Sequence, residues 1–451
     1  MSGLTQQLAA FVAAPDFGPQ YEEACRIART GFTDTIATMM AGSTEPVVGM
    51  LLQHYEGFQC AAQEAPVPFA RKLLPAMYAA CINGTSAHAL DYDDVALSGH
   101  PSTVLVPAIL AGGHVAGASG LDALRAYVIG YEVWAELFGR ETDQYHLKGW
   151  HPTAVLGTVG ATAALAWLNR LPEEQVRNAL AISASMAGGM VANFGTMTKP
   201  LHAGRAAACA VEAVQLAKLG LTAAPDVFEH RAGFLNALSP AGQVDRERPA
   251  AGLGAHLRIT DIGLAVKQYP MCYSAHRGID GLLDILKREK LKPGDVRKVT
   301  TVIGRTQASM LRNHAPQTGL EAKFSMEFAV ASALTAQRVG LNELTDAFVN
   351  RPDVREQFGK VSIECVDTQS AYDPAFSRAD RVVVETSDGR SFDSGEVEYA
   401  RGDPKLPLDE AGLRAKFADC LAVAGFDDAA AATLYAKVAA LEKLGNLREL
   451  F

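Results

Sequence analysis

The sequence lacks the paired cysteines that usually hold a metal ion or cluster. Its seven cysteines stand singly, with no Cys-x-x-Cys pair, so structural zinc and cysteine-ligated iron–sulfur clusters have no sequence signature. An odd, dispersed set of cysteines also fits a reducing compartment. No apolar run reaches the length of a membrane span, and no Lys or Arg precedes the apolar residues at the N-terminus. We therefore expect a soluble, cytoplasmic protein.

Charged residues are also few, and neither sign forms a long block. They make up 20% of the chain, and the net charge is −9. Nucleic acids and anionic membrane surfaces are bound by clustered Lys and Arg, so neither partner is expected. A small anionic substrate stays compatible with this composition, because a local group of cations can override a weak global field.

Helical periodicity dominates the chain from Tyr21 to about Leu264. Residues 172–189, for example, open with a proline and two glutamates and close on glycines, as helices prefer. Abundant alanine and glycine predict close packing between helices. Segments rich in β-branched residues follow after about Lys267, and Asp388-Gly389 predicts a two-residue hairpin turn between two of them.

These patterns predict a mainly α protein with a large all-helical domain and a smaller α+β domain. A chain of 451 residues is long for one core, so two domains are expected. We assign residues 1–267 together with 405–451 to the helical domain, and residues 268–404 to the α+β domain. The helical domain is then discontinuous in sequence, with amphipathic helices returning to it after the proline-broken segment GDPKLP.

Four polar clusters interrupt the apolar background. The first, Asn83–Ala111, holds two histidines and three aspartates just before an apolar helix. The second surrounds a histidine in GWHPTAVLG, and the third and fourth combine cations with histidines. Their titratable residues are His88, Asp91, Asp93, Asp94 and His100; His151; Lys199, His202 and Arg205; and Lys267, Cys272, His276 and Arg277.

His100 and His151 each precede Pro-Ser or Pro-Thr where a helix is expected to begin. Free N–H groups and partial positive charge at a helix N-terminus attract anions. Either histidine could therefore contact a bound carboxylate or exchange a proton with it, although packing at a turn is the alternative for each. Lys199 is expected in a turn ahead of a helix that begins near Gly204. Its ammonium would suit an anion or an enolate oxygen there, and a solvated surface lysine is the alternative.

The aspartates of the first cluster admit two interpretations. Clustered carboxylates suit Mg²⁺, but no second carboxylate cluster and no phosphate loop accompany them, so we expect no metal. In the other interpretation one aspartate caps a helix, one bridges to a histidine or lysine, and one titrates in an active site.

In this order the clusters resemble the MmgE/PrpD family, which includes 2-methylcitrate dehydratases, cis-aconitate decarboxylases and iminodisuccinate epimerases. The family's fold is a large helical domain with a smaller α+β domain, usually in a homodimer. The resemblance also implies cofactor-free chemistry on a small di- or tricarboxylate in a cleft between the domains, lined by residues 83–111. The similar segments are NGTSAHALDYDDVALSGHPS, GWHPTAVLGTVGATAA, TKPLHAGRAA, KQYPMCYSAH and AKFSMEFAVASAL.

Carried over to this sequence, the resemblance implies a set of site residues. Catalytic roles fall to Asp91, His100, His151, Lys199 and Lys267, and substrate binding to Cys272, His276, Arg205 and His202. Cys272 also has a simpler interpretation as a small buried apolar residue. Val95 departs from the pattern, since the decarboxylase branch carries threonine there. The short span from Asp91 to His100 also lacks the Thr-Trp pair of the dehydratases.

The shared chemistry begins with charge on a carbon next to a carboxylate. Removing a proton there needs a base within hydrogen-bond reach and cations around the developing enediolate. Loss of a hydroxyl, reprotonation on the other face, or loss of carbon dioxide can each follow from the same residues. We expect a hydro-lyase resembling 2-methylcitrate dehydratase. An epimerase, a decarboxylase and a non-catalytic carboxylate-binding protein are the alternatives.

Overall fold

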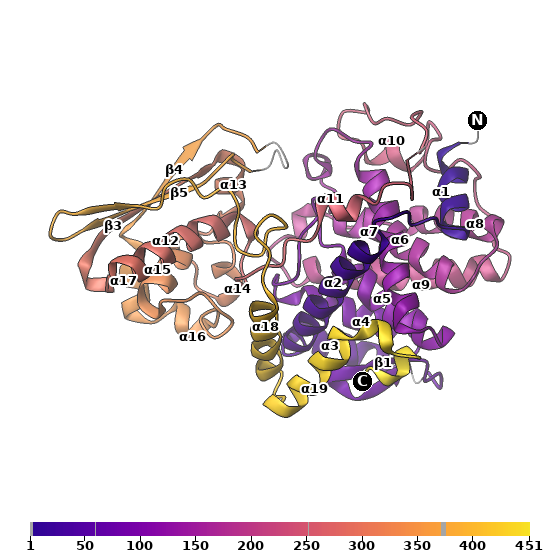
Figure 1. Ribbon diagram of the computed structural model, residues 1–451, viewed down its shortest axis with the longest axis horizontal. Helices are drawn as coiled ribbons and strands as arrows, with labels where there is room; N and C mark the ends of the chain where they lie inside the picture. Colours follow the sequence, from indigo (N-terminus) through magenta and orange to yellow (C-terminus); the bar gives the residue numbers. More distant parts are fainter. Residues whose placement is uncertain (1–2, 59, 251, 371–375) are drawn as a thin grey trace. The chain divides into compact units, whose positions relative to one another are not determined.

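The computed structural model describes residues 3–58, 60–250, 252–370 and 376–451, which fall into two compact units (Figure 1). The larger unit comprises residues 1–266 and 410–451, and the smaller one residues 267–409. The predicted architecture, mainly α with a smaller α+β part, is confirmed. Within the described ranges, no helix has both the length and the apolar character needed to span a membrane.

The larger unit is a bundle of helices built from both ends of the chain. Its helices are α1 (Leu4–Ala13), α2 (Tyr21–Gly42), α3 (Pro46–Glu56), α4 (Ala76–Ala89), α5 (Ser102–Ala116), α6 (Gly120–Phe138), α7 (Pro152–Leu168), α8 (Glu173–Met186), α9 (Thr198–Lys218), α10 (Phe234–Leu238), α11 (Arg258–Ile262), α18 (Glu410–Val423) and α19 (Asp428–Ala439). The expectation of an all-helical domain missed one short hairpin. Its strands β1 (Ala65–Val67) and β2 (Lys72–Leu74) pair antiparallel where prolines at 66 and 68 interrupt helical structure.

Small residues bring α4 and α9 into backbone contact, as the abundance of alanine and glycine predicts. A Cβ atom added at Gly204 of α9 would lie 2.1 Å from the carbonyl oxygen of Cys81 in α4. A Cβ atom at Gly84 of α4 would lie 3.0 Å from the Cα of Gly204. This close approach places the C-terminal end of α4, with its histidine and aspartates, beside the N-terminal end of α9, with its lysine.

A proline lies at or near the start of three helices, α5, α7 and α9. Pro152 is the first residue of α7 and Pro101 is the N-cap of α5, so His151 and His100 stand at helix starts as predicted. The expected start of the third helix near Gly204 was wrong. Helix α9 already begins at Thr198, and Lys199 lies in its first turn. Pro200 is compatible with this start because the first N–H groups of a helix have no partner within the helix.

The smaller unit is a four-stranded sheet with helices on it (Figure 1). The strands lie in the order β4-β3-β5-β6, with β3 and β4 parallel and the other pairs antiparallel. Buried residues of α12, including Ile279 and Leu282, form one core with Val299 and Val382 of the sheet. Its elements are α12 (His276–Glu289), β3 (Val296–Gly304), α13 (Arg305–Met310), α14 (Gly319–Ala322), α15 (Met326–Ala336), α16 (Asp346–Val349), α17 (Pro352–Phe358), β4 (Val361–Val366), β5 (Arg381–Thr386) and β6 (Ser391–Asp393).

The predicted hairpin at Asp388-Gly389 is confirmed, but its loop has three residues, 387–389, rather than two. Strands β5 and β6 pair antiparallel, the backbone N–H of Thr386 donates to the carbonyl oxygen of Arg390, and Gly389 has a φ of 88°. Glycine adopts this backbone conformation without the steric cost that other residues meet.

Candidate functional site

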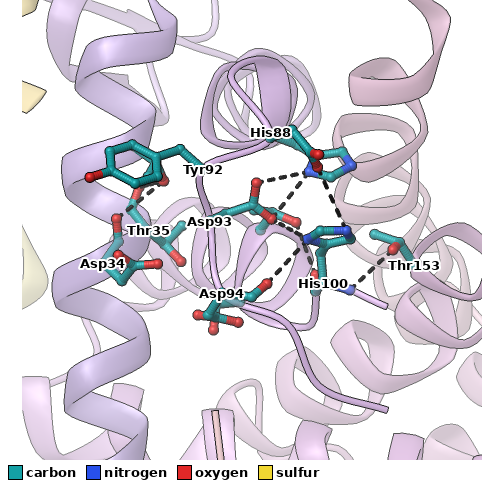
Figure 2. A network of polar contacts seen from close by, with 12 residues as sticks. Asp34, Thr35, His88, Tyr92, Asp93, Asp94, His100 and Thr153 are labelled. Atoms are coloured by element: carbon teal, nitrogen blue, oxygen red, sulfur yellow. Dashed lines mark hydrogen bonds and ion pairs between the residues drawn. The ribbon is translucent and has the colours of Figure 1, made fainter. Parts of the chain in front are cut away.

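Asp93 lies between two histidines at the C-terminal end of α4 (Figure 2). The Nδ1 atom of His88 is 3.0 and 3.1 Å from the two carboxylate oxygens of Asp93. The Nδ1 atom of His100 is 2.6 Å from one of these oxygens. The side chains of His88 and Asp93 are fully buried, whereas that of His100 is 12% exposed. One carboxylate therefore orients two imidazoles, and the more accessible of them is His100.

These contacts assign the tautomer of His100. Its Nδ1 faces two acceptors, Asp93 and the carbonyl oxygen of Asp94 at 3.1 Å, so Nδ1 carries the hydrogen. The Nε2 atom is then left to take up or release a proton. It lies 3.9 Å from a carboxylate oxygen of Asp91. The backbone N–H of His100 also donates to the hydroxyl of Thr153 in the first turn of α7, which joins the first two polar clusters.

Asp91 and Lys199 form a buried ion pair between the end of α4 and the start of α9. The Nζ atom of Lys199 donates to Asp91 Oδ1 at 2.7 Å, and both side chains are 9% exposed. Asp91 has a φ of 53°, a left-handed conformation that aspartate tolerates better than most residues. This turn directs the carboxylate towards α9. Lys199 also lies 5.3 Å from the ring centroid of Phe194, a cation–π distance.

His151 and His202 form a second imidazole pair beside the first. Their Nδ1 atoms are 3.1 Å apart, so one of them donates a hydrogen and the other accepts it. The ring of His151 also lies 4.8 Å from that of Phe194 and 6.0 Å from that of His88. The second and third polar clusters therefore meet the first in one group of side chains within the larger unit.

Burial keeps most of these imidazoles neutral. It lowers the pKa of His88 to about 4, with the Asp93 carboxylate opposing the shift. Burial, together with nearby His88 and Lys199, holds the pKa of His151 well below its ordinary value. The pKa of His202 is likewise lowered to about 4 by burial and the same two groups.

The pKa values of the two deeper aspartates, Asp93 and Asp94, are shifted in opposite directions. Burial alone would raise the pKa of Asp93, but His88 and His100 hold it well below its ordinary value, so the carboxylate is ionised. Burial raises the pKa of Asp94 well above its ordinary value, and neighbouring Asp34 adds to this shift. This shift favours the protonated form of Asp94. The three aspartates of one short motif thus have different surroundings.

Four of these side chains have the donor types of a metal site. Ligand atoms of His88, Asp91, Asp93 and His100 all lie within 4.8 Å of one another. Each donor already has a proton-bearing or cationic neighbour, however. Asp93 accepts from both imidazoles, and Asp91 accepts from Lys199. A divalent ion would have to displace these protons, because metal ligands must be deprotonated.

The remaining site residues predicted from sequence are Arg205 on α9 and three residues of the smaller unit. Arg205 of α9 contacts Cys209, with its Nη2 atom 3.7 Å from the sulfur, and it affects the pKa of Cys81 on α4. Its role in substrate binding stays a prediction. Lys267, Cys272 and His276 belong to the smaller unit, where all three are buried. The backbone N–H of Cys272 donates to the backbone carbonyl oxygen of Lys323, and His276 is the first residue of α12. Their roles also stay predictions.

Two members of the cluster were not among the predicted site residues. His88 and Asp93 lie in the same quoted stretch as Asp91 and His100, yet they were not singled out. The sequence places His88 four residues, about one helical turn, after Gly84, so both lie on the same face of the helix. The structure shows that this face packs against α9. For Asp93 the only signal was its position between Asp91 and His100.

Family models match most of the chain. The MmgE/PrpD N-terminal domain matches residues 6–247, and the MmgE/PrpD C-terminal domain matches residues 269–440. The first match contains all the histidines of the cluster. The second covers nearly all of the smaller unit and continues through α18 and α19 of the larger unit.

Several similar proteins are named cis-aconitate decarboxylase. The cis-aconitate decarboxylase of Homo sapiens is 28% identical over 431 residues, covering 92% of this chain and 87% of that protein. The enzyme of that name from Mus musculus is 30% identical over 359 residues, covering 76% and 71%. The one from Aspergillus terreus is 24% identical over 386 residues, covering 80% and 77%.

Proposed function

The chain belongs to the MmgE/PrpD family, and we propose that it is a lyase acting on a small polycarboxylate by acid–base chemistry without a cofactor. The observation that carries this proposal is the orientation of His100. Its Nδ1–H is held by Asp93, and its Nε2 is free to transfer a proton beside the Asp91–Lys199 pair. Such a carboxylate–histidine pair is the usual arrangement for a general base or acid.

Lys199 supplies the electrostatic part of the proposed reaction. A carbanion beside a carboxylate places a second negative charge on an enediolate, so a preorganised cation lowers the barrier. In the unliganded chain the Lys199 ammonium is paired with Asp91 at 2.7 Å. An incoming carboxylate would compete with Asp91 for this ammonium. The side chains of Asp91, Lys199 and His100 are 9–12% exposed, whereas those of His88 and Asp93 are fully buried, so an anion would meet the first three before it met the other two.

Loss of carbon dioxide is the reaction to test first, because the similar proteins are named cis-aconitate decarboxylases. In that reaction a carbon–carboxylate bond breaks, its electron pair enters the conjugated enediolate, and a proton is then delivered to carbon. His100, protonated at Nε2, is the proposed donor.

Dehydration is the second candidate, and Val95 is the observation that favours it. The decarboxylase branch is expected to carry threonine at this position, and valine has no hydroxyl to offer. Val95 instead pairs its backbone with that of Ala265 through two hydrogen bonds of 2.9 Å. In a dehydration His100 would act as the base that removes the proton, and a second acid would protonate the leaving hydroxyl.

Proton NMR in deuterated water tests the proposal and separates the candidates. The purified protein is incubated with 2-methylcitrate, citrate, cis-aconitate, malate derivatives and iminodisuccinate. Decarboxylation would release carbon dioxide and place one deuterium in the product. Dehydration would create an alkene without loss of carbon. Epimerisation would replace the proton beside the carboxylate with deuterium and invert that carbon, with neither an alkene nor loss of carbon. The variant His100→Gln should abolish whichever signal appears.

A carboxylate-binding protein without catalysis is the outcome that would refute the proposal. It would show no exchange or product with any member of the panel, yet raise its melting temperature in the presence of one of them. The variant Lys199→Met should lose that thermal protection, because the ammonium is the proposed contact for the carboxylate. His151→Ala tests the same distinction, since in an enzyme it should reduce turnover while thermal protection remains.

A further inference from the structure

A buried lysine from the C-terminal segment contacts the motif that carries Asp93. Lys416 lies on α18, and its side chain is 2% exposed. Its Nζ atom is 2.6 Å from a carboxylate oxygen of Asp34 on α2 and donates to the carbonyl oxygen of Tyr92 at 2.7 Å. The ammonium also lies 3.9 Å from the ring centroid of Tyr92. Lys416 thus joins α2, α18 and the residue directly before Asp93.

The Asp34 carboxylate contacts the other side of Asp93. The Asp94 backbone N–H and the Lys416 ammonium both oppose the effect of burial, which raises the pKa of Asp34. Asp34 therefore lies near the peptide group that follows Asp93, while Lys416 binds the carbonyl oxygen that precedes it. Figure 2 shows Asp34 on the opposite side of this loop from His88 and His100. The Asp34–Lys416 pair therefore contacts one side of the loop, and the imidazoles of His88 and His100 contact the opposite side.

The loop needs such support because its backbone is strained. Asp91, Leu97 and Ser98 each have a φ of 53°, and none of them is glycine. Conformations of this kind persist only where surrounding contacts impose them. On the side away from the imidazoles, the contacts that hold the loop from 91 to 100 include the bridge of Val95 to Ala265 and the hydrogen bond from Lys416 to Tyr92.

Stability alone is a weak reason for this ion pair. Asp34 and Lys416 have side chains that are 0% and 2% exposed, so both charges were desolvated on folding. Well-packed apolar residues in place of such a pair are often as stable or more so. What apolar residues would lack is the directed hydrogen bond to the Tyr92 carbonyl, which sets where the next side chain points.

We propose that Lys416 is a positioning residue for the site: oriented by Asp34, it fixes the Tyr92 carbonyl and thereby directs the Asp93 carboxylate towards His88 and His100. A helix that is distant in sequence from the imidazoles would then determine their orientation. The effect of this positioning on catalysis rests on the proposed function, whereas its effect on the loop does not.

Hydrogen exchange and kinetics together test the inference with three variants. Lys416→Met removes the ammonium and leaves Asp34 unpaired. The double variant Asp34→Asn with Lys416→Met removes both charges. Because it leaves no unpaired charge in the interior, it is expected to fold even where the single variant does not. Arg140→Met is the matched control, because Arg140 forms another buried pair in the same unit, 2.6 Å from Glu136. Amide exchange of peptides covering residues 90–101 is followed by mass spectrometry, with peptides of α7 as the internal reference.

The double variant should fold, and its amides in 90–101 should exchange at least about 10-fold faster than wild type while α7 is unchanged. Its kcat should fall by about 100-fold with a smaller change in KM, because the proton-transfer geometry is lost more than substrate binding. Arg140→Met should change neither the exchange of this segment nor kcat.

Wild-type exchange of residues 90–101 in the double variant would overturn the inference, and so would faster exchange with an unchanged kcat. If the wild type converts none of the polycarboxylates, the proposed function fails. In that case the exchange rates alone decide whether Lys416 fixes the loop.

Discussion

The strongest prediction concerns Asp93→Asn, because this change tests the orientation of both imidazoles at once. The carboxylate accepts from His88 at 3.0 and 3.1 Å and from His100 at 2.6 Å. A carboxamide of the same shape has one accepting oxygen and one NH₂ group, which only donates. One histidine must then turn an unprotonated Nδ1 towards the amide. If that histidine is His100, its hydrogen moves to Nε2, and the base is lost.

The magnitude follows from the two lost functions. A wrong histidine tautomer beside an amide costs about 10⁴-fold in kcat where a carboxylate–histidine pair is catalytic. A hydrogen bond to a charged group contributes about 1.5–3 kcal/mol, and the asparagine oxygen keeps one of the two interactions. We therefore expect a loss of about 2 kcal/mol in the free energy of unfolding. The activity loss should be far larger than the stability loss can explain.

The assay compares Asp93→Asn with Asp380→Asn, a matched change in the smaller unit. Asp380 is also buried and accepts two kinds of side-chain hydrogen bond, from Ser377 at 2.6 Å and from Gln307 at 3.0 Å. Turnover of the best substrate is measured by NMR, and stability by urea unfolding. The control should lose stability without losing kcat per folded molecule. An Asp93→Asn protein with at least half the wild-type kcat would refute the assigned role.

Three further predictions concern charge and protons in the same cluster. Lys199→Met should lower kcat by about 100-fold or more in the same NMR assay, because the enediolate loses its cation. The control Lys148→Met, a change at an exposed lysine, should leave kcat unchanged. The pKa of His88, about 4 in the folded protein, lies below its ordinary value near 6.5, so the unfolded chain binds more protons between these pH values and stability falls as the pH is lowered. At pH 5 this one group should cost about 2 kcal/mol relative to pH 8 in urea unfolding, and His88→Gln should remove that part of the pH dependence. Dialysis against EDTA should leave kcat unchanged and added Zn²⁺ should inhibit, because an ion among the four donors would displace the protons that the imidazoles give to Asp93; activation by Zn²⁺ would contradict this account.

Sequence reasoning was most successful where a local rule determines local structure. Proline after His151 and His100 marks the start of α7 and α5, and Asp388-Gly389 marks the β5–β6 turn. The error at Lys199 shows where such rules become ambiguous. A lysine before proline is disfavoured inside a helix but allowed in its first turn, and the sequence did not distinguish these positions.

The partners of the site residues were harder to predict, because they depend on contacts between distant segments. The order of the motifs indicated that Asp91 and Lys199 belong to one site, and the structure pairs them across 108 positions. No local pattern indicates that Lys416 contacts Tyr92, since these residues are 324 positions apart. That contact exists because α18 packs on α2, which periodicity alone cannot specify.

The three aspartates of the motif illustrate why residue type and spacing do not assign a role. Asp91 turns towards α9 through a left-handed backbone and pairs with Lys199, and Asp93 is ionised between two imidazoles. The pKa of Asp94, the next residue, is raised by burial and by neighbouring Asp34, which favours its protonated form. The expectation that one aspartate bridges to a lysine or histidine holds for two of them. Neighbouring residues of one type thus acquire different surroundings from the segments that pack on them. The catalytic role of Asp91 stays a prediction, and in the proposed function His100 transfers the proton while Asp93 orients that histidine.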